Sequence, residues 1–214
     1  IGFWETNGRI GSKLELIEAS IARRLKERDP NRADVRPISA ERVILGAKLL
    51  AGGTTLTRTQ AIDVPDGGGG TTAAMTPAPL LPDWTEPDIA ILLSRPVFDA
   101  EIYGAVRFHH RTAREYLTAV WLNDLLQRHT SRSRIEQIFF REQYGMEVIV
   151  PSTRPVLQWL VLFDDAIRAR VQRLSPQLFL EGGDPSQLPL SLRKEILGEI
   201  CAELKNGGPR HLAY

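Results

Sequence analysis

The sequence predicts a mainly α-helical protein: a helical domain, then a winged-helix domain with a small β-wing, then α-solenoid-like helix pairs. Three observations indicate this fold class. Apolar residues recur at helical spacing along most of the chain. A β-branched and glycine-rich stretch interrupts them after residue 53. Short helical segments separated by proline or glycine fill the last third.

The first domain, which we place at residues 1–53, is predicted to contain two helices. Ser12 begins the S-x-x-E spacing of a capping box, and an apolar stripe runs along residues 12–28. Ser39 is expected to cap the second helix, and the glycine pair at 52–53 is expected to end it.

Residues 54–130 are predicted to form the winged-helix domain. The β-branched residues 54–64 favour one or two short strands, and a flexible loop rich in glycine and proline is expected at 65–80. Thr85 is expected to cap a short helix, and residues 102–108 favour a strand or hairpin. Two short helices followed by a β-wing and another helix is the order of a winged-helix domain.

Capping-box spacing occurs twice more, in the pairs Thr112–Glu115 and Ser133–Glu136. The first pair predicts the start of a heavily apolar, buried helix. The second predicts a helix that ends near Gly145.

Residues 131–214 are predicted to be a helical, HEAT-like repeat region. Four short helices are expected there, at residues 155–163, 166–174, 176–181 and 190–204. Helix pairs that cannot bury their apolar faces alone are typical of an α-solenoid.

Composition limits the class of protein. Hydrophobic residues make up 43% and charged residues 25% of the 214, which is ordinary for a folded domain. The 27 basic and 26 acidic residues leave a formal net charge of +1, whereas a dedicated nucleic-acid-binding protein needs a basic surplus. One cysteine, Cys201, excludes an internal disulfide and a CxxC zinc site. We therefore expect a cytoplasmic protein with no membrane partner, and the even charge balance argues against a nucleic-acid partner.

The segment FHHRTAREYLTAVWL resembles the F-x-H-x-[ST]-x-x-E-[FY]-x-A-A segment of NACHT-type STAND NTPases, which joins their winged-helix and following helical domains. Arg111 stands where the related MHD motif has aspartate, so the similarity is to the NACHT variant. Residues 1–25, 81–99 and 154–189 resemble other parts of bacterial NACHT-like proteins, so the resemblance covers nearly the whole chain. The matching residues of the segment are Phe108, His110, Thr112, Glu115, Tyr116 and Ala119.

This resemblance implies the C-terminal, regulatory part of a STAND ATPase, a signalling protein whose outputs include defence against phage. In the family the winged-helix domain closes on the nucleotide and its histidine, here His110, senses the ADP phosphates. An imidazole suits that role because it donates a hydrogen bond and can gain charge. The implied partners are an upstream NTPase domain, a protein ligand or effector, and further copies that form an oligomer on activation.

The chain itself is expected to catalyse no reaction and to bind no cofactor or metal ion alone. A Walker A loop needs G-x-x-x-x-G-K-[ST]. Gly67–Gly70 have no such lysine, and GRIGSK at residues 8–13 has the wrong spacing. Because the chain also lacks an initiator Met, we expect a piece of a longer protein that binds ATP and ADP upstream.

Each of these residues also has a structural interpretation. His110 would then only pack the junction of a strand and a helix. Thr112 and Glu115 are most simply a helix cap, and a catalytic Glu–His pair is the alternative. Alternation along a strand would put His109 on the side opposite His110, so the two would not share a metal ion.

The basic middle of the chain and its tryptophans have simpler interpretations. The arginines between residues 107 and 141 are expected to pair with acidic surfaces of neighbouring domains or to face solvent. Three tryptophans are expected to anchor the core: Trp84, Trp121 and Trp159.

Two other functions stay open. The chain could be a helical-repeat scaffold that binds a protein and has no nucleotide role, or, with less support, a winged-helix DNA-binding regulator. An upstream GxxxxGK[ST] loop would favour the switch, and a start codon near Ile1 would favour the scaffold. Salt-dependent binding to duplex DNA would favour the regulator.

Overall fold

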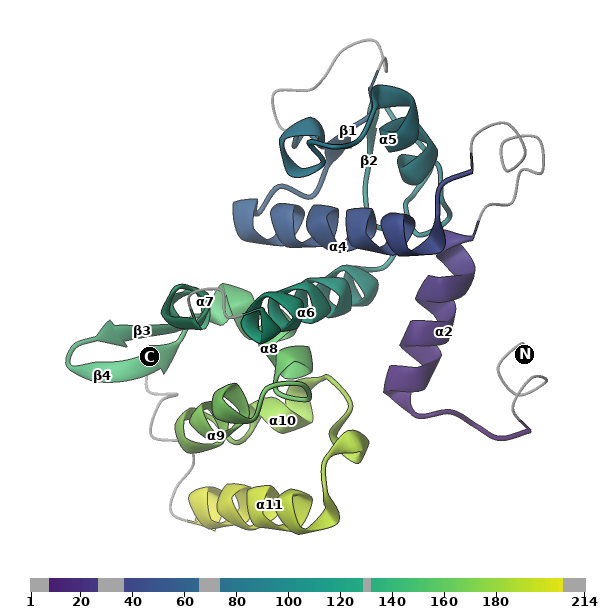
Figure 1. Cartoon of the computed structure of the whole chain (residues 1–214). Helices are drawn as coiled ribbons and strands as arrows, with labels where there is room; N and C mark the ends of the chain where they lie inside the picture. The colour runs from purple at the N-terminus through teal and green to yellow at the C-terminus, as the bar shows by residue number, and fades with distance from the viewer. Residues whose placement is uncertain (1–7, 27–36, 66–73, 129–131, 206–214) are drawn as a thin grey trace. The chain divides into compact units, whose positions relative to one another are not determined.

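A computed structural model describes residues 8–26, 37–65, 74–128 and 132–205 (Figure 1). These residues are mainly helical and contain two small antiparallel sheets, which confirms the predicted mainly α class. None of their helices is long and apolar enough to cross a bilayer.

The chain divides into two compact units. The first unit comprises residues 1–11 and 15–124, and the second comprises residues 12–14 and 125–214. The division into three domains drawn from the sequence stays a prediction.

The first unit contains most of the longer helices. Its elements, in chain order, are α2 (Lys13–Leu25), α4 (Ala40–Thr57), β1 (Ile62–Asp63), the 3-10 helix η1 (Ala78–Leu80), α5 (Glu86–Leu93), β2 (Ala105–Val106) and α6 (Arg111–Gln127). The first residues of α2 and the last residues of α6 group with the second unit. The small sheet and α5 lie together on one side of α4 (Figure 1).

Helix α4 is longer than its sequence predicts. Ser39 caps it as expected, accepting a hydrogen bond from the backbone N–H of Arg42. The predicted stop at Gly52 and Gly53 is wrong, because the helix continues to Thr57, and only two of the residues expected in strands form β1.

Tertiary packing explains why the glycine pair lies inside α4. A Cβ on Gly52 would lie 2.5 Å from the indole ring of Trp121, and one on Gly53 would lie 2.3 Å from Leu80. Because these two glycines have no side chain, Trp121 and Leu80 can pack closely against α4. The hydroxyl of Thr54 also donates to the carbonyl of Leu50, at 2.8 Å, so β-branched residues are accommodated within the helix.

The strand expected before α6 is part of a small antiparallel arrangement. β1 pairs with β2, with Ile62 opposite Val106. β1 also forms a parallel bridge to Met75, and Phe98 forms an antiparallel bridge to Phe108 across a turn. The rings of Phe98 and Phe108 pack at 4.7 Å between centroids. The chain therefore reaches α6 from a hairpin, as the sequence predicts.

The second unit is a set of short helices with one hairpin. Its elements are α7 (Arg132–Phe139), β3 (Phe140–Gln143), β4 (Met146–Ile149), η2 (Pro151–Thr153), α8 (Arg154–Leu160), α9 (Asp165–Leu174), α10 (Leu178–Glu181), η3 (Pro185–Gln187) and α11 (Leu190–Lys205). The four helices expected in the last third are present as α8 to α11. Trp159 of α8 is buried, as expected of a core anchor, whereas Trp84 and Trp121 in the first unit are half-buried.

The hairpin β3–β4 was not expected from the sequence. A helix running to Gly145 is wrong, because α7 ends at Phe139 and the chain turns back at Tyr144 and Gly145. Both turn residues have positive φ, +53° and +72°, which matches the right-handed twist of a two-residue hairpin. Ser133 lies inside α7 rather than before it.

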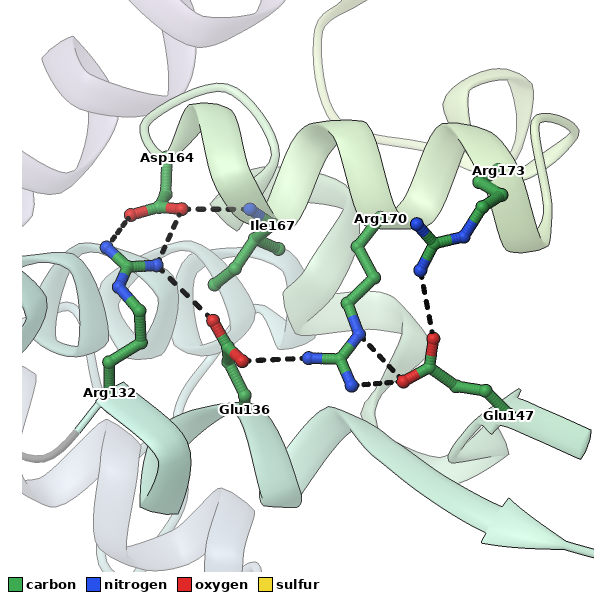
Figure 2. Close-up of polar contacts among 7 residues, drawn as sticks. All are labelled: Arg132, Glu136, Glu147, Asp164, Ile167, Arg170 and Arg173. Atoms are coloured by element: carbon green, nitrogen blue, oxygen red, sulfur yellow. Dashed lines mark hydrogen bonds and ion pairs between the residues drawn. The ribbon is translucent and has the colours of Figure 1, made fainter.

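A chain of ion pairs joins α7, α9 and the hairpin (Figure 2). Arg132 binds Asp164 through two hydrogen bonds, at 3.1 and 2.8 Å, and also reaches Glu136. Arg170 of α9 bridges Glu136, at 2.8 Å, to Glu147 of β4. Because each arginine bridges two elements, the network fixes the hairpin against α9.

Asp164 is the most buried member of this network, with 5% of its surface exposed. Its side chain also caps α9 by accepting from the backbone N–H of Ile167, at 2.9 Å. Burial alone would raise the pKa of Asp164, but the hydrogen bonds from Arg132 and Ile167 outweigh it, so the pKa of this carboxyl is lowered. The carboxylate therefore stays charged inside the fold.

Replacing Gly52 by alanine should destabilise the first unit, since the added methyl group meets the Trp121 ring. Overpacking of this kind costs about 1–3 kcal/mol. Gly198→Ala is the matched control, because its Cβ would meet nothing within 4 Å and should add about 0.5–1 kcal/mol of helix stability. Chemical denaturation of both variants checks the pair. Equal effects of the two substitutions would contradict the packing described here.

Arg132→Leu should destabilise the second unit by about 1–3 kcal/mol, because it leaves the buried carboxylate of Asp164 without its guanidinium partner. The folded pKa of Asp164 is lowered, so its contribution is present above the ordinary pKa of about 4 and is lost as the pH falls below it. The destabilisation should therefore shrink below about pH 4. Arg134→Leu, on the exposed side of α7, is the control. A loss independent of pH would contradict the assignment.

Candidate functional site

The junction between the first unit's hairpin and α6 contains the residues that the resemblance selects. The backbone N–H of His109 donates to the carbonyl of Val97, at 2.9 Å, and so ends the hairpin. The carbonyl of His110 accepts from the N–H of Ala113, at 3.1 Å, and so begins the helix. His110 therefore occupies the N-cap position of α6, where backbone N–H groups favour anions.

The side chain of His110 is exposed and contacts Arg24 of α2. Its Nε2 lies 3.3 Å from Nη2 of Arg24. Because a guanidinium can only donate, Nε2 must accept, and the neutral ring then carries its proton on Nδ1. Nη1 of the same guanidinium donates to the carbonyl of Pro96, at 3.1 Å. Arg24 thus positions the imidazole and fixes its tautomer.

The surroundings of His110 lower its pKa. Desolvation is the largest cause, followed by the neighbouring charges of His109 and Arg24, while Asp99 acts in the opposite direction. The neutral imidazole is therefore favoured near pH 7, with Nδ1–H as a hydrogen-bond donor.

His109 does not lie opposite His110, so the prediction from strand alternation is wrong. Both side chains are exposed, and the two rings meet edge to face with centroids 4.3 Å apart. The reason is that the chain leaves the extended conformation between them and turns into the helix. Nδ1 of His109 lies 2.6 Å from a carboxylate oxygen of Asp99, which holds His109 to the hairpin.

Thr112 is not the N-cap of α6, which corrects the predicted capping box. The helix begins at Arg111, so Thr112 lies exposed in its first turn. Glu115 is buried and pairs with Arg111, its neighbour one turn earlier, at 2.5 Å. Arg111 therefore has an acidic partner within the chain. The carboxylate of Glu115 is occupied by that ion pair rather than placed beside a histidine.

The remaining residues of the matching segment are internal. Phe108 packs on the ring of Phe98, and Ala119 is fully buried. Tyr116 is buried and its hydroxyl donates to Glu18 of α2, at 2.6 Å. Burial and this hydrogen bond raise the pKa of Tyr116. These side chains join α6 to the hairpin and to α2, and His110 is the segment's residue left facing solvent beside a cation.

The arrangement at His110 can bind an anion but offers no metal site. A neutral imidazole with an Nδ1–H, a guanidinium and a helix N-terminus all favour negative charge. No group of three or more histidine, cysteine or acidic side chains with metal-binding geometry occurs among the described residues. Sequence reasoning missed Arg24, because helical periodicity places three neighbouring basic residues, Arg23, Arg24 and Lys26, on the same polar side.

No protein-family model matches the chain, and comparisons with curated proteins and with solved structures give no significant match.

Arg24→Ala should raise the pKa of His110 towards its ordinary value of about 6.5, because it removes both a neighbouring charge and part of the ring's burial. In the native chain the lowered pKa means that the unfolded state binds more protons, so this site's contribution to stability falls as the pH drops through about 6.5. NMR titration of the His110 ring measures the shift. Arg23→Ala, on the exposed side of α2, is the control. An unchanged pKa in Arg24→Ala would show that Arg24 does not set the state of the ring.

Proposed function

We propose that this chain is the regulatory part of a nucleotide-dependent switch, of the kind found in NACHT-like STAND ATPases. Its role would be to close over ADP held by an upstream NTPase domain and to release it when a protein ligand and ATP favour the open state. Such a switch requires contacts that differ between two states. His110 is our candidate for one of them.

The order of elements in the first unit supports the winged-helix part of this proposal. Helix α4, strand β1, the short η1, helix α5 and the hairpin that ends at Phe108 follow one another as in a winged-helix domain. α6 then begins directly after the hairpin.

The single observation that carries the proposal is the state of His110. An exposed imidazole is held by Arg24 with its Nδ1–H directed away from that contact, at the first turn of a long helix. A diphosphate would accept hydrogen bonds from both side chains. Hydrogen bonds from a guanidinium to a phosphate are charge-assisted and therefore strong. A residue that only packed the junction would be buried like Phe108.

A DNA-binding role has less support than the sequence alone gave it. In a winged-helix order the recognition helix is α5, whose residues EPDIAILL include no arginine or lysine. Its first turn carries Glu86 and Asp88, which repel a phosphate backbone. A protein-binding scaffold is the second candidate, favoured by exposed leucines on α11.

The proposal is tested in the full-length parent by His110→Ala, with His109→Ala as the matched control. Losing a hydrogen bond to a charged group costs about 1.5–3 kcal/mol, so ADP should dissociate roughly ten- to a hundredfold faster and basal activity should rise. His109 is also exposed but is held by Asp99, so its substitution should leave ADP retention near the native level.

Equal ADP retention in the native and His110→Ala proteins would remove the sensing role. Tight binding or turnover of MgATP by the 214-residue chain alone would overturn the wider proposal, because the nucleotide-binding site would then lie within this chain and not in an upstream domain.

A further inference from the structure

Helix α2 begins with an acceptor supplied by a residue that is distant in the sequence. The backbone N–H of Leu14, in the first turn, donates to the carboxylate of Asp184, at 2.8 Å. First-turn amides have no acceptor within their own helix, so a carboxylate there stabilises the start of the helix and complements its dipole. Beside it, the side-chain amide of Gln187 donates to the hydroxyl of Ser12, at 2.9 Å. Residues 12–14 belong to the second unit, which therefore holds the start of α2.

Asp184 is a buried carboxylate whose hydrogen bonds keep it charged. Its side chain is 5% exposed and also accepts from the hydroxyl and the backbone N–H of Ser186. Burial alone would raise the pKa of Asp184, but the hydrogen bonds from Ser186, Leu14 and Ser12 outweigh it, so the pKa of this carboxyl is lowered. A negative charge therefore lies at the N-terminus of α2, where it stabilises the helix most.

The rest of α2 belongs to the first unit and has few anchors there. The buried residues of the helix are Ile21 and Leu25. In the middle of the helix, Glu18 accepts from the hydroxyl of Tyr116, at 2.6 Å. In the last turn, Arg24 contacts the His110 ring. One uninterrupted helix thus carries the contact with Asp184 at its start and the contact with His110 at its end (Figure 1).

We propose that α2 packs and detaches as one cooperative unit, so that Asp184 determines how often Arg24 is in place beside His110. A helix of 13 residues is marginally stable by itself in water, so each half of α2 depends on the contacts of the other half. Two contacts that require the same formed helix stabilise one another, and this coupling is reciprocal. Asp184 is therefore a positioning residue for the site at His110.

The coupling gives the second unit a way to regulate that site. A ligand of the second unit that drew Asp184 away from Leu14 would favour the detached state of α2. Detachment would remove Arg24 from His110, and with it the cation that favours a bound diphosphate. This consequence for nucleotide retention rests on the function proposed above, whereas the coupling along α2 involves no nucleotide.

Native-state hydrogen exchange of the 214-residue chain, followed by NMR, tests the coupling. In Asp184→Ala the amides at both ends of α2, at residues 17–18 and 24–25, should lose protection by the same factor. That factor should be about two- to thirtyfold, the range found when a capping side chain is removed. Asp165→Asn is the control, because it removes a carboxylate that is 91% exposed in the first turn of α9. It should leave the exchange of α2 unchanged.

Tyr116→Phe tests the same coupling from the first unit and decides the question if Asp184→Ala does not fold. This substitution keeps the buried ring and removes the hydroxyl that donates to Glu18. By reciprocity, the amide of Leu14, which is bound to Asp184, should lose as much protection as the amide of Leu25.

Two results would overturn the cooperative unit. One is a loss of protection in Asp184→Ala that is confined to the first turns of α2 and leaves residues 24–25 unchanged. The other is an unchanged Leu14 amide in Tyr116→Phe. Neither measurement contains nucleotide, so the two results are independent of whether His110 senses ADP.

Discussion

The hydrogen bond between Arg24 and His110 determines what the junction in the first unit can do. An arginine side chain has no acceptor, so the imidazole must meet it with an unprotonated nitrogen. This contact and the ring's surroundings keep His110 neutral, place its proton on Nδ1 and set a fixed positive charge beside it. The junction therefore presents a donor and a cation together, while the ring itself stays uncharged. That combination is suited to an anion that arrives and leaves, because binding needs no proton uptake.

The two adjacent histidines differ because their partners have opposite chemistry. His109 meets the carboxylate of Asp99, which can only accept, so the Nδ1 of His109 must carry a proton. His110 meets a group that can only donate. The Nδ1–H of His109 is therefore bound to Asp99, whereas the Nδ1–H of His110 is directed away from its contact with Arg24. Packing explains three other positions of the matching segment, since Phe108, Tyr116 and Ala119 are all buried.

Sequence reasoning located the elements well wherever local signals act alone. Ser39 and Thr85 cap the helices they were expected to cap, because a side-chain oxygen at that position satisfies an amide within the same turn. The predicted ends of helices were wrong where contacts with residues distant in the sequence determine them. Gly52 remains helical because Trp121 packs against it. Thr112 is not the N-cap because α6 already begins at Arg111.

The sequence predicted one residue of the candidate site, His110, but not its partner Arg24. The resemblance singled out His110, and the cap position follows from where the hairpin ends. Arg24 could not be chosen, since Arg23, Arg24 and Lys26 share the polar side of α2 and only the fold shows which one reaches the ring. The hairpin β3–β4 was missed because its turn, Tyr144–Gly145, lacks the usual Asn-Gly signal and follows directly from a helix.

In the second unit, polar side chains connect the short helices to one another and to the hairpin. Arg170 ties α9 to both α7 and the hairpin, and its guanidinium also lies 4.3 Å from the centre of the Phe140 ring. The side-chain amide of Gln172 on α9 in turn donates to Glu195 and Glu199 of α11. α9 is therefore the element through which α7, the hairpin and α11 are connected.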